Sequence, residues 1–197
     1  PAAVGLFFLS GPIIITLFGS DKFQHLDVLM SSYSLMAYSI GLFGFIMVKV
    51  LLPGFYARQD TKTPVKIGII ALVVNMVFNL IFVLPWIYLG YEGPHTGLAL
   101  ATSLSAMTNA FLLFKGLRKS NHYCPSKGWK KVWFQVVVAN TLMGSLLWYL
   151  SENIQIWQYW DSIEKVIVLL LLVAVAVIVY FCTLWLLGVK VKSFLKG

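Results

Sequence analysis

Apolar residues fill most of the chain in six long segments, which short polar stretches separate. The segments are residues 1–18, 28–52, 64–87, 96–117, 132–150 and 163–187. A helix needs roughly 20 residues to cross a hydrocarbon core about 30 Å thick. The pattern therefore predicts six membrane-spanning helices in an antiparallel bundle, with the first segment short for a full crossing.

Composition supports an all-α, polytopic membrane protein. Of the 197 residues, 59% are hydrophobic and 11% are charged, whereas a soluble domain carries about 25% charged residues. The net charge of +8 does not indicate a nucleic-acid partner, because the basic residues lie at the ends of apolar segments. Cys124, Cys182 and three scattered histidines predict neither a disulfide framework nor a zinc site.

Basic residues lie almost entirely on one side of the predicted bundle. Thirteen of the 15 lysines and arginines fall near residues 49–66, 115–131 and 190–196, and Lys22 and Lys165 lie on the other side. Positively charged connections stay in the cytoplasm. This asymmetry predicts that both chain ends, and the connection between the second and third segments, are cytoplasmic.

This connection reads LLPGFYARQDTKTPVKI over residues 51–67. Pro53 and Gly54 are expected to end the second helix, because proline cannot continue a helix and glycine tolerates the turn. Thr63 is expected to cap the next helix, with Pro64 as its first residue. The pattern favours a simple positively charged turn, and the alternative is a gate or headgroup contact at the mouth of a transport path.

Polar residues follow one face of each of three neighbouring segments. The positions are Ser34, Tyr38, Gly41, Phe45 and Lys49; Asn75 and Asn79; and Thr102, Ser105 and Asn109. Such faces serve hydrogen bonds between packed helices or line a wet cavity. Their presence on three adjacent segments favours a shared cavity.

The last segment, in contrast, has no polar face and is expected to contact lipid. The sequence holds no Ser/His/Asp constellation, zinc-binding HExxH or phosphate-binding glycine loop. Catalysis is therefore not predicted.

Residues 49–67, KVLLPGFYARQDTKTPVKI, resemble the signature of the MurJ (MviN) family of lipid II flippases. The first segment resembles the Pro-x-x-x-Gly-Leu segment of that family, and the similarity extends along the whole chain. The matching signature residues are Phe55, Tyr56, Ala57, Arg58, Asp60, Thr63, Pro64 and Val65.

The resemblance implies a two-lobed fold of fourteen spans, which multidrug (MATE) pumps and polysaccharide exporters share. The chain would supply spans nine to fourteen, and the N-terminal half with its essential arginines would be missing. Residues 1–119 would form four spans of the C-terminal lobe and residues 120–131 a cytoplasmic loop. Residues 132–197 would form two peripheral helices, which shape a groove for the undecaprenyl tail, and a short cytoplasmic tail.

The implied function is transport rather than catalysis. The substrate would be lipid II, an undecaprenyl-pyrophosphate-linked peptidoglycan precursor. It would move from the inner to the outer leaflet of the bacterial cytoplasmic membrane, among membrane lipids, for cell-wall synthesis. A polysaccharide (O-antigen) flippase, a MATE pump and a non-transport membrane scaffold are the alternatives.

The resemblance also suggests site residues. Ser34, Tyr38, Lys49, Arg58 and Asn109 are the candidates for the cavity and the substrate. Family members bind sodium at positions similar to Asn75, Asn79 and Thr102. This chain has amides where a hard cation usually takes a carboxylate, which argues against sodium and leaves the membrane potential as the other candidate for coupling.

Overall fold

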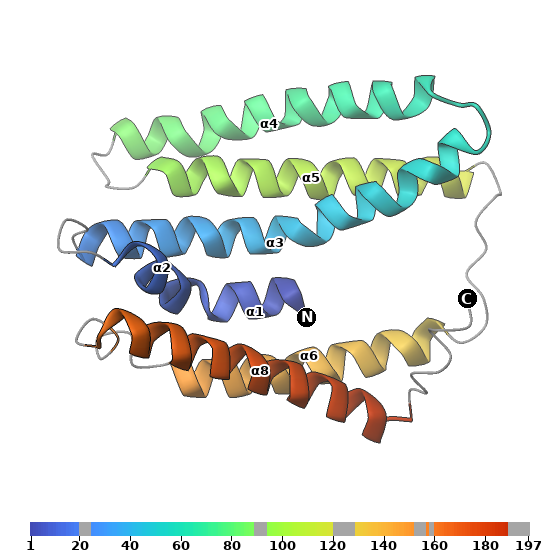
Figure 1. Ribbon diagram of the computed structural model, residues 1–197. Helices are drawn as coiled ribbons and strands as arrows, with labels where there is room; N and C mark the ends of the chain where they lie inside the picture. Colours follow the sequence, from blue (N-terminus) through green and yellow to red (C-terminus); the bar gives the residue numbers. More distant parts are fainter. Residues whose placement is uncertain (20–24, 89–93, 120–128, 152–156, 158–159, 189–197) are drawn as a thin grey trace. The chain divides into compact units, whose positions relative to one another are not determined.

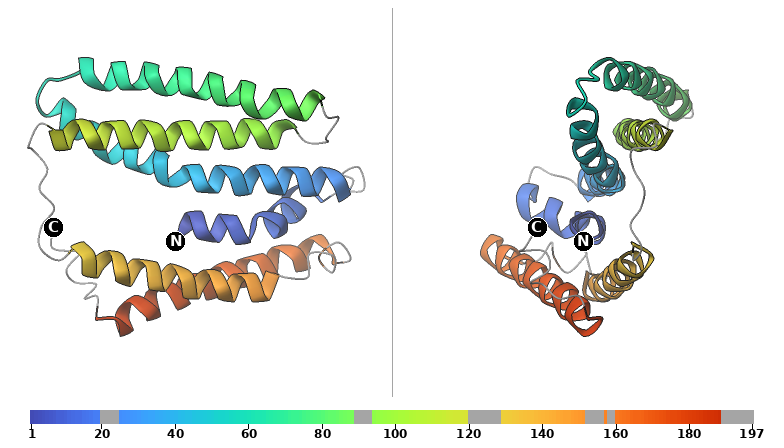
Figure 2. Two further views of the ribbon diagram at one scale, coloured as in Figure 1. Left: turned by 180° about the vertical axis from the view of Figure 1, so that it is seen from behind. Right: turned by 90° about the vertical axis from the view of Figure 1, so that its right-hand side faces the viewer.

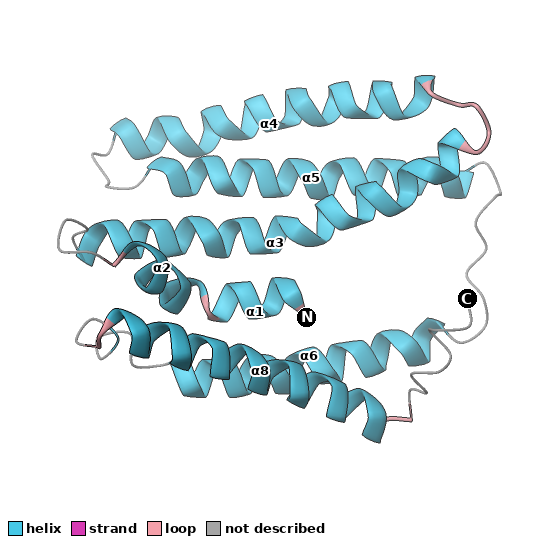
Figure 3. Cartoon of the chain, in the orientation of Figure 1, coloured by secondary structure: helices cyan, strands magenta, loops and turns pink. Residues whose placement is uncertain are grey.

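The computed structural model describes residues 1–19, 25–88, 94–119, 129–151, 157 and 160–188 (Figure 1). All regular secondary structure within these residues is helical (Figure 3). The helices are α1 (Ala2–Phe8), α2 (Ser10–Phe18), α3 (His25–Tyr56), α4 (Lys62–Tyr88), α5 (Pro94–Lys119), α6 (Trp129–Ser151) and α8 (Ser162–Leu186).

Five of these helices, α3, α4, α5, α6 and α8, are long and apolar enough to cross a membrane. This confirms the predicted all-helical, multi-pass character. The bounds of the last five predicted segments agree with the helices to within a few residues at most ends. The first predicted segment is different, because it forms two short helices.

The break between α1 and α2 falls at Leu9. Pro12 has no amide hydrogen, so it cannot donate to the carbonyl of Phe8, and its ring crowds that carbonyl. The Ser10 hydroxyl donates to the Phe7 carbonyl at 3.0 Å, which satisfies a second acceptor at the break. The first predicted segment is therefore two short helices, and the sixth membrane span stays a prediction.

The chain forms two compact units. Unit 1 comprises Pro1–Val28 and Pro125–Gly197, and unit 2 comprises Leu29–Cys124. In unit 2, α5 lies between α3 and α4 (Figures 1 and 2). The end of α3, the start of α4 and the end of α5 lie together at one end of this unit. The predicted grouping of residues 1–119 as one lobe stays a prediction, and most of the predicted loop 120–131 lies outside the described residues.

In unit 1, α6 packs against α8 and α1, and α2 packs against α8. The buried face of α8 consists of Lys165, Leu172, Ala176 and Tyr180, at steps of seven, four and four residues along one face. Large apolar side chains such as Leu170 and Trp185 remain 63% and 71% exposed on the rest of the helix. This surface is suited to lipid, and the lipid contact expected from the sequence stays a prediction.

Candidate functional site

The α3–α5 seam depends on small residues. A Cβ added at Gly41 would lie 2.5 Å from the Ser103 Oγ, and one at Gly44 would lie 2.7 Å from the Met107 backbone nitrogen. The buried Ser103 hydroxyl donates to the Ala37 carbonyl of α3 at 2.6 Å. Glycine thus allows the two backbones to approach closely enough for a hydroxyl to bridge them.

The predicted polar face of α3 has both a packed part and an exposed part. The half-buried Ser34 donates to the Met30 carbonyl at 3.1 Å, and its Oγ lies 3.4 Å from the Thr96 Oγ1 on α5. Tyr38 is 45% exposed, and Lys49 is exposed two turns before the end of α3. The exposed part therefore forms an edge of α3 that runs toward the turn at residues 57–61.

The α4–α5 seam holds the second set of predicted polar residues. The Asn79 amide donates to the Asn75 Oδ1 at 3.1 Å, and the Asn75 amide reaches the Thr102 Oγ1 at 3.5 Å. The buried Ser105 hydroxyl donates to the Ala71 carbonyl at 2.6 Å. These groups hold α4 to α5, which is the helix-packing role that the sequence left open beside a cavity.

Asn109 lies on the same face of α5 as Thr102 and Ser105, at steps of three and four residues, and it is half-buried. This face is the one that bonds to α4. Asn109 therefore belongs to a different side of α5 from Ser103, which bonds to α3. The structure does not bring Asn109 together with the exposed edge of α3.

The three residues suggested for sodium offer a poor set of ligands. The Asn79 Oδ1 is buried without a hydrogen-bond partner in the described part of the chain, so it could serve as one ligand. The Asn75 Oδ1 already accepts the Asn79 amide. Among the described residues, no group of three or more His, Cys, Asp or Glu could hold a metal. A hard cation usually needs several oxygen ligands with a carboxylate among them, so these residues do not fit a sodium ion.

The signature turn begins with a buried anchor. Phe55 is 5% exposed and packs in an apolar cluster with Ile67, Leu113 and Leu117. A Cβ added at Gly116 on α5 would lie 3.2 Å from the Phe55 ring. This contact fixes the end of α3 against α5, and the residues that follow Phe55 therefore leave from a defined position.

Two local predictions for this turn were wrong. Helix α3 continues through Pro53 to Tyr56, and the Ala57 amide still donates to the Pro53 carbonyl at 2.9 Å. Proline in the last turns of a helix removes only one amide donor. Helix α4 begins at Lys62, so Thr63 lies inside its first turn and is not the N-cap.

Asp60 performs the capping role instead. Its Oδ1 accepts the Thr63 amide at 3.0 Å, as an N-terminal carboxylate commonly does. Hydrogen bonds from the Thr63 side chain and backbone lower the pKa of Asp60 below its ordinary value, and Lys66 contributes in the same direction. Gln59 turns the chain with φ of 59°, in the left-handed region that a non-glycine residue seldom adopts.

The signature thus divides into two groups. Phe55 and Pro64 are buried, and Asp60 caps α4 through Thr63, so these residues build the turn. Tyr56, Ala57 and Arg58 are exposed and contribute little to its packing. Arg58 is the exposed side chain whose guanidinium can bind a phosphate with two parallel hydrogen bonds.

Comparison with known proteins identifies the family. The sequence model described as lipid II flippase MurJ matches residues 1–168. The chain belongs to the MurJ family of lipid II flippases.

Relatives in this family match nearly all of the chain. A probable lipid II flippase MurJ of Haemophilus influenzae is 44% identical over 96% of the chain. A probable lipid II flippase MurJ of Vibrio cholerae is 44% identical over 98% of it. The lipid II flippase MurJ of Burkholderia cenocepacia is 40% identical over 98%. The chain spans only 36%, 35% and 36% of the lengths of these relatives.

The MurJ-family resemblance seen in the sequence is thereby confirmed, but two structural residues were missed. Ser103 sits beside Thr102 in the sequence, and only the helix geometry shows that it bonds to α3 rather than α4. Gln135, which was not among the predicted site residues, is buried and donates to the Leu187 carbonyl at 2.8 Å. A buried polar residue within an apolar segment was the available signal.

Proposed function

We propose that residues 1–197 are part of a flippase that moves lipid II from the inner to the outer leaflet of the bacterial cytoplasmic membrane, for cell-wall synthesis. Family membership supports this proposal, as do five apolar helices of membrane-spanning length. The protein is in this view a transporter and not an enzyme. The remaining part of the protein, with the other lobe of a fourteen-span MATE-like fold, is its necessary partner.

The observation that carries the proposal is the exposed Arg58 on a turn that is anchored at both ends. Phe55 anchors the turn on one side, and Asp60 caps the helix on the other. Arg58 itself is exposed, so its guanidinium is available to a ligand. A pyrophosphate headgroup carries the oxygens that arginine binds in pairs.

The proposed path continues from this turn along the exposed edge of α3. Lys49 and Tyr38 are exposed on that edge, and Ser34 is half-buried further along. We assign the edge to the substrate side of the protein, with Lys49 and Arg58 at its cytoplasmic mouth. Asn109 lies on the α4-facing side of α5 and enters this path only if that seam opens during transport.

Orientation and driving force follow from charge. We place the turn at residues 57–61 and the C-terminal end of α5 in the cytoplasm, because both lie at the same end of unit 2 and carry the basic residues Arg58, Lys62, Lys115 and Arg118. When an anion leaves a cell whose interior is negative, its electrostatic free energy falls by about 2.3 kcal/mol per charge per 100 mV. The membrane potential can therefore drive the pyrophosphate outward, and it is the coupling we propose in place of sodium.

The outer surface of α8 suits the hydrophobic tail of the substrate. Its apolar side chains include Ile167, Leu170 and Phe181, which are 51%, 63% and 56% exposed. We propose that α6 and α8 are peripheral helices that guide the undecaprenyl chain. No charged side chain interrupts α8 after Lys165, so the tail would meet a continuous apolar surface.

The test replaces Arg58 in the whole protein, in cells depleted of their own flippase. Arg58→Ala and Arg58→Lys are both expected to impair growth and lipid II export, because lysine cannot reproduce the paired hydrogen bonds of arginine. Lys130→Ala is the control, since Lys130 is an exposed basic residue at the start of α6, outside the signature. Full complementation by both Arg58 variants would reduce Arg58 to a topology signal and overturn its proposed role.

A further inference from the structure

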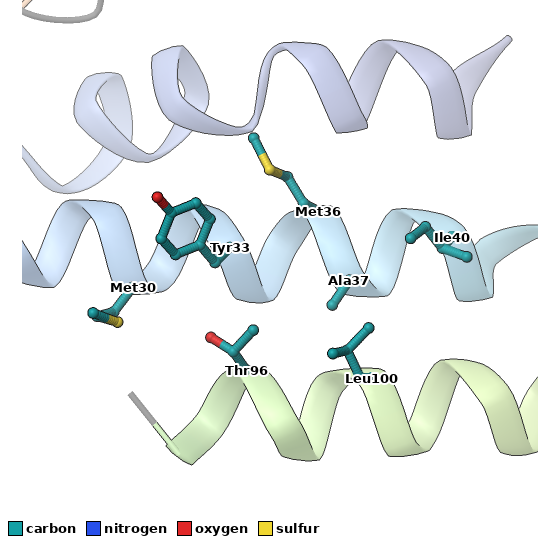
Figure 4. Close-up of a pocket in the computed structure, with 7 residues that line it drawn as sticks. All are labelled: Met30, Tyr33, Met36, Ala37, Ile40, Thr96 and Leu100. Atoms are coloured by element: carbon teal, nitrogen blue, oxygen red, sulfur yellow. The ribbon is translucent and has the colours of Figure 1, made fainter. Parts of the chain in front are cut away.

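Lys165 is the only charged side chain that is buried among the described residues. It is 8% exposed and lies on the packed face of α8 with Leu172 and Ala176. The cavity beside α3 and α5 in unit 2, in contrast, is lined by uncharged residues, with polar side chains only at Tyr33 and Thr96 (Figure 4). Lysine is seldom buried without a partner, so a group of opposite charge is expected near the Lys165 ammonium.

The described residues do not supply this negative charge. Asp161 lies four residues before Lys165, where a carboxylate often pairs with a lysine on a helix. It caps α8 instead, in a capping box in which the Glu164 Oε2 accepts the Asp161 amide at 3.3 Å. Both carboxylates are exposed, and within the described residues no ion pair or hydrogen bond reaches the Lys165 ammonium. The ammonium is therefore available to an anion from outside these residues.

Lys165 lies at the end of unit 1 where α6 ends and α8 begins (Figure 1). Side chains on a helix lean toward its N-terminus, and Lys165 follows the start of α8 at Ser162 by only three residues. Its stem therefore runs toward this end, as lysine stems do when they carry a charge from apolar surroundings to a membrane interface. In the proposed orientation, Lys130 and Lys131 mark the opposite end of α6 as cytoplasmic, so the Lys165 ammonium belongs to the outer interface.

The surface around this end suits the headgroup layer of a membrane. Trp148 and Tyr149, in the last turn of α6, are 62% and 75% exposed, and Ile163, in the first turn of α8, is 74% exposed. Exposed Trp and Tyr are typical of the interface between membrane and water, and Ile163 can contact the upper part of an acyl chain. A lipid at this place would have its phosphate at the depth of the Lys165 ammonium.

We propose that the Lys165 ammonium binds the phosphate of a glycerophospholipid in the outer leaflet. A phosphodiester carries a single negative charge, which one ammonium neutralises, whereas a pyrophosphate carries more charge than Lys165 alone can match. A free phosphate ion lacks the tails that the apolar surface around this end would contact. The buried stem already holds the ammonium in place, so binding does not have to order a flexible side chain. The proposal rests on the proposed orientation and not on lipid II as the substrate.

The test is photo-labelling of the whole protein in an uncharged detergent. The probe is a phosphatidylglycerol with a diazirine at the top of one acyl chain, and mass spectrometry measures the adducts on residues 160–170. Lys165→Met removes the charge and keeps an unbranched stem, so it is expected to lower this labelling several-fold. Lys165→Arg keeps a positive charge and is expected to retain most of it.

Two controls separate the phosphate contact from general lipid binding. Lys130→Met removes an exposed lysine at the opposite end of α6 and should leave the labelling of residues 160–170 unchanged. A diacylglycerol with the same acyl chains and diazirine lacks the phosphate and should label the parent protein several-fold less. This second comparison uses no variant, so it remains decisive even if Lys165→Met does not fold.

Two results would overturn the proposal. Equal labelling by the phospholipid and the diacylglycerol, or of the parent and a folded Lys165→Met, would show that the tails alone bring lipid to this end. Displacement of the probe by inorganic phosphate or undecaprenyl pyrophosphate, but not by unlabelled phosphatidylglycerol, would show that the site serves a different anion. The readout is a lipid adduct and not transport, so a failed flippase assay would leave the proposal standing.

Discussion

The two units hold their helices together in different ways. In unit 2, glycine and serine bring backbones into contact, and the hydroxyls of Ser103 and Ser105 bond to carbonyls of neighbouring helices at 2.6 Å. In unit 1, α8 packs with aliphatic residues such as Leu172 and Ala176, and the long amide of Gln135 reaches the Leu187 carbonyl. Where two helix backbones are in contact, neither helix can shift without separating the pair. Where only the ends of side chains are in contact, those side chains can move to accommodate a change.

This difference matters for a transporter. Unit 2 carries the signature turn and the exposed edge of α3, which are the parts proposed to meet an anionic headgroup. A binding group must be held to within a fraction of an ångström to act, which rigid packing provides. The exposed apolar surface of α8, which is proposed to contact the hydrocarbon tail, does not need such precise positioning, because contacts with hydrocarbon are not directional.

The largest expected effect comes from adding one methyl group to the α3–α5 seam. Gly44→Ala would place a Cβ 2.7 Å from the Met107 backbone nitrogen and 2.8 Å from the Ala106 carbonyl carbon. Backbone atoms cannot move aside without separating the helices, so the variant should lose about 1–3 kcal/mol of stability. Thermal unfolding of the whole protein in detergent measures this loss.

Two further glycines provide matched controls. At Gly144 on α6 an added Cβ would meet the ends of the Phe8 and Val4 side chains at 2.9 and 3.2 Å, and at Gly68 on α4 it would meet nothing within 4 Å. Gly144→Ala should therefore cost less than Gly44→Ala. Gly68→Ala should be neutral or stabilising by up to about 1 kcal/mol, because alanine favours the helix. Equal losses at positions 44 and 144 would contradict the difference between the units.

A smaller effect is expected from the amides of α6. Gln135→Leu removes the hydrogen bond from its Nε2 to the Leu187 carbonyl, and such bonds between membrane helices contribute about 0.6–2 kcal/mol. The Asn140 Oδ1 is buried without a partner among the described residues, so Asn140→Leu removes an unsatisfied group and should be neutral or stabilising.

The same unfolding measurement compares the two variants, which replace an amide by leucine on one helix. Gln135→Leu is expected to unfold at the lower temperature. If Asn140→Leu were the more damaging of the two, the hydrogen bond from the Asn140 Nδ2 to the Val136 carbonyl would outweigh the cost of the unpartnered Oδ1, and the expected order would be wrong.

The sequence predicts the membrane helices well because the signal, a run of apolar residues about 20 long, is strong and local. It fails where one residue decides between two local outcomes. Pro12 breaks the first segment, yet Pro53 stays inside α3. Near a helix end, a proline costs little because water or a neighbouring group can donate to the carbonyl that loses its partner. The sequence alone does not reveal whether a given proline breaks a helix or stays inside it.

The candidate site is predictable only in part for a related reason. Spacing places Ser34, Thr102 and Asn109 on helix faces, but it does not say which neighbour each face meets. Helix α5 has a different neighbour on each of two sides, so Thr102 and Ser103, adjacent in sequence, serve different seams. That information lies in the packing order of the helices and not in the periodicity of any one of them.

The smallest expected effect concerns Asp60, which caps α4. It tests the distinction between residues that build the signature turn and residues, such as Arg58, that are exposed on it. Asp60 accepts the Thr63 amide, and these hydrogen bonds lower its pKa in the folded protein. A carboxyl whose pKa is lowered by folding stabilises the protein above its unfolded pKa of about 4, and this contribution is lost as the pH falls through the lower, folded value. Asp60→Ala should therefore lower the unfolding temperature slightly at neutral pH, and the difference from the parent protein should shrink in acid. Asp60→Asn keeps a good capping group, so its unfolding temperature at neutral pH should match that of the parent protein. If Asp60→Asn reduced lipid II export as much as Asp60→Ala does, the signature would require the negative charge at this position and not the cap.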